Sequence, residues 1–257
     1  TSREAMPELL DRYRTAAARG DLRSDTAQEK VLARLAVLSD ALAASTPRGL
    51  LGRFRKPAEK LNGLYIFGEV GRGKTMLMDL FFAHAAIASK RRVHFHAFMQ
   101  DVHARLHALR RNQAQDAIAP VAKAIAAESR LLCLDEMQGT DIADAMILGR
   151  LFSKLFELGT VVVATSNVAP ADLYKGGLNR ALFLPFIAQI SRHMDVMRLD
   201  ARTDFRLEKL VGVKMWLVPA DRAADAALDR AWAKMTGNAP CKPRDISIKG
   251  RILHVPC

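Results

Sequence analysis

The segment GEVGRGKT, residues 68–75, constrains the fold of this chain more than any other stretch. It satisfies the pattern G-x-x-x-x-G-K-[ST]. It stands between a short apolar run, Leu64–Phe67, which predicts a β-strand, and a stretch from about Thr75 to Ala88 that predicts a helix. Glycines let the backbone amides of such a turn point at one anion, and the helix N-terminus adds its positive end. The segment therefore predicts a phosphate-binding loop.

Within this loop, two side chains have distinct expected tasks. We expect Lys74 to reach the outer phosphates of a nucleotide and Thr75 to hold Mg²⁺. A glycine-rich turn that only joins a strand to a helix is the alternative, and the complete motif in this position disfavours it. The expected nucleotide-binding residues are Gly68, Glu69, Val70, Gly71, Arg72, Gly73, Lys74, Thr75 and Met76.

After the loop, apolar runs alternate with helical patterns. The runs are continuous, which is typical of strands covered on both faces and therefore of a parallel sheet. We thus predict an α/β fold of the P-loop NTPase type, with a three-layer parallel sheet. The further predicted strands are Val93–Met99, Leu131–Asp135, Thr160–Ser166 and Met194–Asp200, and the predicted helices end near Arg111 and span Asp141–Glu157.

Changes in composition divide the chain into four expected segments. They are an N-terminal helical segment (1–46), a basic linker (47–62), the P-loop core (63–200) and a partial C-terminal α+β segment (201–257). Asp25 and Gln28 resemble a capping box, in which the first side chain accepts hydrogen bonds from amides and the second reaches back.

Two carboxylates follow the apolar run LLCL. Asp135 is expected at the carboxyl end of a central strand, where α/β sheets bind ligands, and there it would help to hold Mg²⁺. Glu136 would then activate the attacking water, which must lose a proton as it attacks. Two acids after a strand are common in themselves, but the phosphate loop upstream favours the catalytic interpretation.

Asn167 and Arg180 complete the expected catalytic set. Asn167 follows the run VVVATS and could orient the water or contact the γ-phosphate, although Asn is also an ordinary residue at strand ends. Arg180 could stabilise the charge of the transition state from a neighbouring subunit. Arg192 is the alternative for that task, Arg206 could contact nucleotide within its own chain, and a solvated arginine is common in so basic a chain.

Charge and cysteine content narrow the class of protein. The formal net charge of +12 favours acidic partners such as nucleotides, nucleic acid, anionic lipid or an acidic protein face. The three cysteines form no C-x-x-C pair, which disfavours a disulfide scaffold or a cysteine zinc site and favours a reducing compartment. No apolar run approaches the ~20 residues of a membrane span. Because the chain begins with Thr1, we expect that a leader or further sequence has been removed.

Two other patterns have competing interpretations. His103 and His107 are spaced for metal binding on a helix, but no third ligand is evident, so surface or packing histidines are favoured. The basic segments Arg48–Lys60 and Lys90–Arg92 could bind nucleic acid or lipid headgroups. A solvated basic face is the more common explanation for such segments.

Longer phrases resemble a known family. GLYIFGEVGRGKTMLMDLFF, RRVHFHAFMQDVH, LLCLDEMQGTDIADAMILGRLF, VVVATSNVAP, FLPFIAQI and GRILHVP together resemble the ZapE / AFG-one-like ATPases, a branch of the AAA+ type P-loop ATPases of bacteria and mitochondria. The phosphate loop is generic to P-loop proteins, whereas HFHAFM with DEMQGTDIADAMILGRLF is specific to this family. The resemblance covers nearly the whole chain.

Carried over by position, the resemblance implies an enzyme that hydrolyses ATP with Mg²⁺ and assembles into a homo-oligomeric ring. It makes Lys74 and Thr75 the Walker A pair, Asp135 and Glu136 the Walker B pair, Asn167 sensor 1 and Arg180 the arginine finger.

The resemblance also implies partners and a location. Bacterial members are tied to cell division, with a partner in the FtsZ ring at the inner membrane face, and mitochondrial members to quality control of inner-membrane proteins. We expect a cytoplasmic enzyme with peripheral membrane association, or a matrix enzyme if the source is eukaryotic. A helicase-loader-like ATPase directed to nucleic acid and a scaffold that binds nucleotide without turnover are the alternatives. Family members continue past GRILHVP, so we expect the C-terminus to be cut short.

Overall fold

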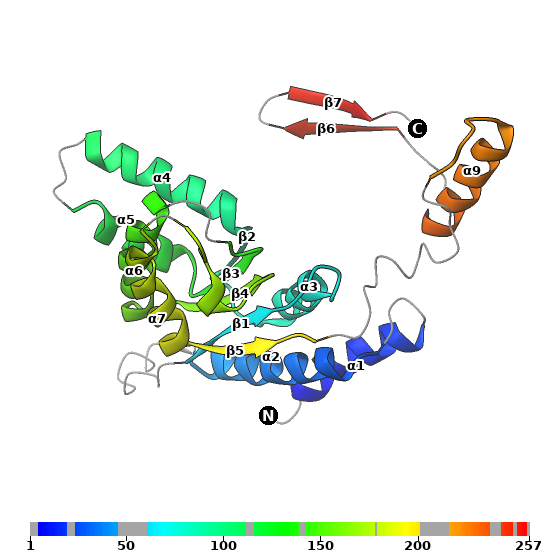
Figure 1. Ribbon diagram of the computed structural model, residues 1–257. Coiled ribbons are helices and arrows are strands. Elements are labelled where there is room, and N and C mark those ends of the chain that lie inside the picture. Colours follow the sequence, from blue (N-terminus) through cyan, green and yellow to red (C-terminus); the bar gives the residue numbers. More distant parts are fainter. Residues whose placement is uncertain are drawn as a thin grey trace. The chain divides into compact units, whose positions relative to one another are not determined.

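The computed structural model describes residues 5–19, 24–45, 61–111, 116–138, 142–177, 179–200, 216–236, 243–248 and 251–255 (Figure 1). The chain divides into two compact units, Thr1–Thr203 and Asp204–Cys257. The four segment boundaries expected from composition stay a prediction, and most of the expected basic linker lies outside the described residues.

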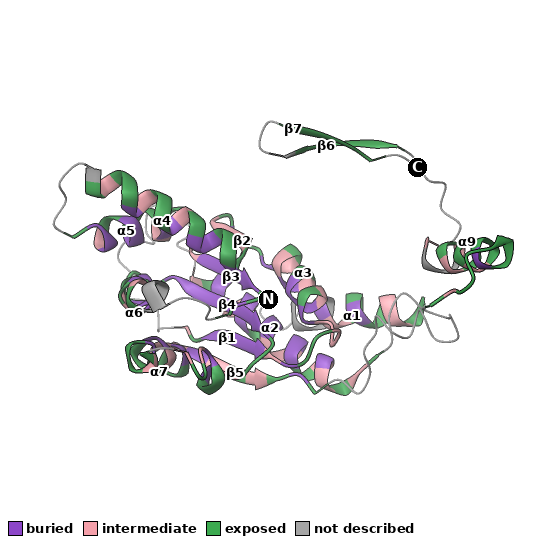
Figure 2. Ribbon diagram, turned by 45° about the horizontal axis from the view of Figure 1, so that its top comes forward, coloured by how far each residue is buried: buried purple, intermediate pink, exposed green. Residues whose placement is uncertain are grey.

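A five-stranded parallel sheet forms the centre of the first unit. Its strands stand in the order β2-β3-β4-β1-β5, and every neighbouring pair is parallel. The central strands are buried, as Figure 2 shows, which explains why their sequences are continuous apolar runs. The strands are β1 (Gly63–Phe67), β2 (Lys90–His94), β3 (Leu131–Asp135), β4 (Val161–Ser166) and β5 (Met194–Arg198).

Helices cover both faces of this sheet and complete three layers. Successive residues of β3 point to opposite faces: Cys133 belongs to the cluster formed with α1, α2 and α3, and Leu134 to the cluster formed with α4, α5, α6 and α7 (Figure 1). The predicted three-layer α/β fold is therefore confirmed. The helices are α1 (Ala5–Ala18), α2 (Thr26–Ser45), α3 (Lys74–His84), α4 (Phe95–Arg111), α5 (Ile118–Glu128), α6 (Ile142–Glu157) and α7 (Leu184–His193), with short 3₁₀ turns η2 (Pro170–Asp172) and η3 (Arg180–Leu182).

The structure corrects the second predicted strand. Val93–Met99 was expected to be extended, but β2 ends at His94 and α4 begins at Phe95. Phe98 and Val102 are fully buried and lie four residues apart, which is the spacing of a helix face. Helix α5 was not predicted, and α3 ends at His84, before the predicted Ala88. Apolar residues at positions 93, 95, 97 and 99 continue the alternation of a strand past the point where the helix begins, which hid the boundary.

The second unit contains a helix, α9 (Arg222–Thr236), and an antiparallel hairpin of β6 (Arg244–Ile248) and β7 (Arg251–Val255). Asp221 accepts hydrogen bonds from the amides of Ala223 and Ala224 at 3.0 Å and thereby caps α9. No helix among the described residues has the length and apolar character that crossing a membrane requires.

Candidate functional site

The phosphate loop begins where β1 is wedged between its two neighbouring strands. The amide of Gly68 donates to the carbonyl of Ser166 at 3.2 Å, and the amide of Leu199 donates to the carbonyl of Phe67 at 2.7 Å. A Cβ atom at position 68 would lie 2.5 Å from the carbonyl oxygen of Leu199. Only glycine fits this approach, so the first residue of the motif is required by packing.

The loop curls around its own lysine. Gly71 and Gly73 have φ of 81° and 87°, the left-handed region that glycine adopts without strain. The Nζ atom of Lys74 donates to the carbonyl of Gly68 at 2.6 Å and to that of Glu69 at 2.7 Å, and only 8% of Lys74 is exposed. An ammonium group is thus held within the loop, where a nucleotide phosphate could replace the carbonyl oxygens.

Asp135 is the buried acid of the site. It is 1% exposed, and its two oxygens have different partners. Oδ1 accepts a hydrogen bond from the hydroxyl of Thr165, and Oδ2 pairs with Nη2 of Arg92 at 3.0 Å. Arg92 also pairs with Asp79 on α3. The cation and the hydroxyl donor therefore fix the orientation of this buried carboxyl group.

Glu136 directly follows in an unusual backbone conformation. Its φ is 56°, which few residues other than glycine adopt. Thr165 holds it there, because its hydroxyl accepts from the amide of Glu136 at 3.0 Å and its carbonyl from the amide of Met137 at 2.7 Å. The side chain of Glu136 is exposed and lines a hollow of about 300 Å³ together with His94 and His96.

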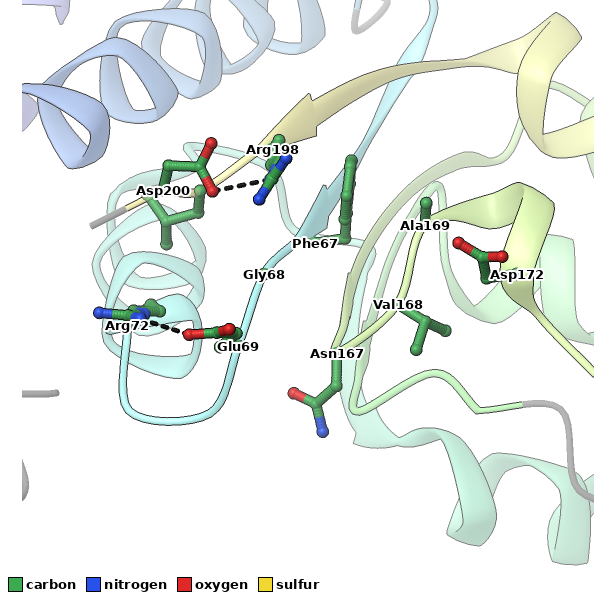
Figure 3. A pocket seen from close by; sticks show the side chains of 11 residues that line it. Phe67, Gly68, Glu69, Arg72, Asn167, Val168, Ala169, Asp172, Arg198 and Asp200 are labelled. Carbon is green, nitrogen blue, oxygen red and sulfur yellow. Dashed lines mark hydrogen bonds and ion pairs between the residues drawn. The ribbon is translucent and has the colours of Figure 1, made fainter. Parts of the chain in front are cut away.

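Asn167 lies at the end of β4, beside a second hollow of about 600 Å³ (Figure 3). Glu69 and Arg72 of the phosphate loop line the same hollow and form an ion pair. The hydroxyl of Tyr65 donates to the carbonyl of Val168 at 3.0 Å and so fixes the turn that follows Asn167. The structure therefore brings Asn167 and the phosphate loop to one cavity.

The three candidate arginines are placed differently. Arg180 opens η3, where its Nη2 donates to the carbonyl of Ala171, and its buried Nε has no partner among the described residues. It does not line either hollow described above. Arg192 is exposed in the last turn of α7, and Arg206 lies outside the described residues. A finger acting on a neighbouring subunit stays a prediction.

Sequence reasoning missed two side chains of this site and misassigned a third. Thr165 was passed over in favour of Asn167, two residues further along the chain. The signal that Thr165 leaves in the sequence is weak, because it is only a threonine one position before the end of a strand. Arg92 was assigned to a basic segment. Gln28 was expected to reach back in a capping box, but this was wrong: Asp25 caps the amides of residues 27 and 28, whereas the Gln28 side chain donates to the carbonyl of Arg72 at 2.9 Å.

The basic segment Lys90–Arg92 has internal partners. Nζ of Lys90 donates to the carbonyls of Phe82 and Ala85 at 2.6 and 2.8 Å, at the end of α3. Arg91 pairs with Asp101 at 2.8 Å, and Arg92 pairs with Asp135. These cations therefore hold the site and the sheet edge together. The other basic segment, residues 48–60, lies outside the described residues.

The oxygen ligands expected for Mg²⁺ fit that ion. Asp135 supplies a buried carboxylate and Thr75, in the first turn of α3, an exposed hydroxyl, and magnesium favours oxygen ligands with few protein groups. Within the described part of the chain, no cluster of three or more His, Cys, Asp or Glu side chains is arranged to hold a metal ion. His103 and His107 both lie exposed on α4.

Comparison with known proteins gives the following similarities. Residues 8–257 match the AFG1-like ATPase family. The cell division protein ZapE of Escherichia coli K12 is 40% identical over 238 residues, which cover 88% of this chain and 63% of that protein. Lactation elevated protein 1 homolog B of Danio rerio is 42% identical over 201 residues, 74% of this chain and 40% of that protein. The chain thus spans less than two thirds of either relative.

One solved structure illustrates the more distant likeness. AMPPCP-bound DnaA from Aquifex aeolicus has a TM-score of 0.49 and 16% identity, covering 85% of this chain and 62% of that one. A likeness at this level has no bearing on what the present chain binds.

Proposed function

The chain belongs to the AFG1-like ATPase family, and from this premise we propose that it is a Mg²⁺-dependent ATPase of the AAA+ type that remodels a protein partner. One observation carries the proposal. Adjacent residues of β4 hold both halves of the site, because the carbonyl of Ser166 binds the first amide of the phosphate loop while the side chain of Thr165 binds Asp135. The phosphate loop and a buried carboxylate are thus both hydrogen-bonded to the carboxyl end of β4.

Binding of ATP would begin with Lys74. Its ammonium would exchange the carbonyls of Gly68 and Glu69 for oxygens of the outer phosphates. The new contact is stronger because the phosphate oxygens are charged and the carbonyl oxygens are not. Thr75 and Asp135 would hold Mg²⁺, which supplies positive charge to the phosphate oxygens when bound. Arg92 would keep Asp135 oriented through its ion pair with Oδ2.

Hydrolysis would then depend on Glu136 and Asn167. The exposed carboxylate of Glu136 would accept a proton from the attacking water, and the backbone held by Thr165 would fix where that carboxylate stands. Asn167, at the cavity beside the phosphate loop, would orient the water or the γ-phosphate. Both tasks need fixed geometry, because positioning contributes much of the rate in phosphoryl transfer.

Arg180 would act on the nucleotide of an adjacent subunit in a homo-oligomeric ring. Its guanidinium is close to the surface on a short 3₁₀ turn, and among the described residues its hydrogen-bond partner is the backbone carbonyl of Ala171. An arginine that contacts the transferring phosphoryl group typically contributes about 10³-fold or more to turnover. Turnover that depends on assembly is therefore the expected behaviour.

The client we favour is a division protein of the FtsZ type, with work done in the cytoplasm beside the inner membrane. The similarity to the Escherichia coli protein, whose name assigns it to cell division, supports this choice. Quality control of inner-membrane proteins in a mitochondrial matrix is the alternative for a eukaryotic source. A nucleic-acid client is less favoured, because the described basic segment Lys90–Arg92 is engaged internally.

The first test is ATP turnover against protein concentration. We expect the rate per chain to rise with concentration, to respond to an FtsZ-type protein and to ignore single-stranded DNA. A rate that is constant with concentration and stimulated by DNA would contradict the division role. The matched control is Lys74→Ala, which should abolish ATP binding, whereas tight ATP binding by wild type without turnover at any concentration would favour a nucleotide-binding scaffold.

A further inference from the structure

A buried glutamine connects the N-terminal helices to the phosphate loop. Gln28 lies in the first turn of α2 and is 1% exposed, yet its side chain is polar. Its Nε2 atom donates to the carbonyl of Arg72 at 2.9 Å, across 44 positions of sequence. A buried amide is retained only where its hydrogen bonds are satisfied, so this contact stabilises one arrangement of the loop.

The orientation of this amide follows from its other partner. The hydroxyl oxygen of Tyr13 accepts from the amide of Asp25 at 3.0 Å, so its own proton is directed to Oε1 of Gln28 at 2.6 Å. Burial raises the pKa of Tyr13 and keeps this proton in place. With Oε1 accepting from Tyr13, Nε2 must face the carbonyl of Arg72. The hydrogen-bond chain therefore has one direction.

The carbonyl that Gln28 holds belongs to the peptide before Gly73. In a trans peptide the C=O and N–H groups point in opposite directions. Fixing the carbonyl of Arg72 toward α2 thus aims the amide of Gly73 away from α2. Gly73 has φ of 87°, and a Cβ atom there would lie 2.7 Å from Nε2 of Gln28. The side chain of Gln28 and the loop backbone are therefore in direct contact. Because the backbone of glycine can adopt many conformations, a hydrogen bond from outside the loop helps to keep one of them.

We propose that Gln28 is a positioning residue of the nucleotide site, which keeps the peptide between Arg72 and Gly73 turned so that its amide faces the phosphates. Tyr13 acts through Gln28 by fixing which end of the amide meets the loop. The inference rests on the proposed function, because it concerns how the same loop binds ATP or ADP. It assigns the N-terminal helices a part in nucleotide affinity and not only in covering the sheet.

Two substitutions at position 28 test the donor. Gln28→Met keeps the length and removes both polar atoms, while Gln28→Glu keeps the acceptor for Tyr13 and places an oxygen against the carbonyl of Arg72. Each should weaken the Kd for Mg²⁺–ADP, measured by isothermal titration calorimetry, by about tenfold or more. Because ground state and transition state use the same amide, KM for ATP should rise while kcat at saturation stays within about threefold.

The control and the second variant separate positioning from stability. Leu38→Ala removes a fully buried side chain from the same helix but away from the loop, and it should lower the thermal midpoint while leaving the Kd unchanged. Tyr13→Phe should weaken the Kd by about threefold. In the double variant Gln28→Met/Tyr13→Phe the Kd should equal that of Gln28→Met alone.

The outcomes distinguish this inference from the proposed function. Wild-type affinity for ADP in Gln28→Met, Gln28→Glu or Tyr13→Phe would overturn the positioning role while the ATPase proposal stands. A Kd that weakens as much in Leu38→Ala would also overturn it, since affinity would then merely follow stability. If wild type does not bind nucleotide, or binds it unchanged after Lys74→Ala, the proposed function fails and the inference fails with it.

Discussion

Replacing Thr165 by Val tests whether one hydroxyl group organises the acidic side of the site. Thr165 is 1% exposed, and its Oγ1 atom both donates to Asp135 and accepts from the amide of Glu136. Valine has nearly the same shape and lacks the hydroxyl. The substitution therefore removes two hydrogen bonds without creating a cavity.

The magnitude follows from the kinds of bond that are lost. A hydrogen bond to a buried carboxylate contributes about 1.5–3 kcal/mol, and a neutral one about 0.5–1.5 kcal/mol. The added methyl group of valine offsets about 0.8 kcal/mol of this loss by its own burial. We expect the free energy of unfolding to fall by about 2 kcal/mol, which lowers the thermal midpoint of a unit of this size by about 4–8 °C. ATP turnover should fall by about tenfold or more, because Glu136 loses the contact that sets its backbone.

Urea unfolding followed by circular dichroism measures the first effect, and a coupled assay of phosphate release measures the second. Thr160→Val is the matched control, because Thr160 stands just before the same strand at its other end and is 4% exposed. In the described part of the chain, the hydroxyl of Thr160 has a single long bond of 3.5 Å, to the carbonyl of Ser129. This control should unfold within about 0.5 kcal/mol of wild type and keep full turnover.

Equal unfolding midpoints for Thr165→Val and Thr160→Val would refute the reasoning. That result would mean that the hydroxyl of Thr165 exchanges its bonds for water at no cost and does not hold either acid. A loss of stability with unchanged turnover would refute only the second half, by showing that Glu136 keeps its position without this contact.

Three further predictions use other parts of the molecule. Glu136→Gln should leave ATP binding nearly intact while turnover falls ~10²-fold or more, as loss of a general base predicts, and equal rates would rule out that role. Gly73→Ala should weaken ADP binding strongly, because φ of 87° strains alanine by about 1 kcal/mol and its Cβ has no room; calorimetry with wild-type affinity would contradict this. Arg105 hydrogen-bonds Glu128 and lowers the pKa of that carboxyl; burial alone would raise the pKa of Asp101, but the bonds from arginines outweigh it and lower that pKa too. Both carboxyls thus stabilise the fold above about pH 4.5, and this stabilisation disappears as the pH falls through their lowered pKa values. Arg105→Met should therefore reduce the drop in the unfolding midpoint between pH 6 and pH 3. A drop as steep as in wild type would argue against these ion pairs.

Several parts of the fold were predictable because local sequence determines them. The continuous apolar run of β3 requires burial on both faces of the sheet. In any strand, successive side chains point to opposite faces. The phosphate loop is also determined by local sequence, because its left-handed glycines and the start of α3 lie within a few consecutive residues. Asp135 was predictable at the site because a parallel sheet gathers the carboxyl ends of its strands at one edge.

Other parts were not predictable, because they depend on pairs of residues far apart in the chain. Apolar residues recur at every second position from Val93 to Met99, as in a strand, and only the packing of Phe98 against the core decides that α4 begins at Phe95. Gln28 satisfies a capping pattern by spacing alone, but the position of α2 over the sheet places its amide within reach of Arg72. A polar side chain can have two possible hydrogen-bond partners, and the tertiary structure decides which of them it binds.

The sequence by itself determined the chemistry that is available: a glycine-rich loop with Lys74, a strand ending in Asp135 and Glu136, and the alternation that makes a parallel α/β sheet. These features are encoded in residues that are neighbours along the chain, so their spacing is enough to reveal them. The tertiary structure alone decided that Thr165 holds both acids and that Gln28 holds the phosphate loop. Those contacts join residues from different elements, and only the packing of the strands and helices sets the distances between them.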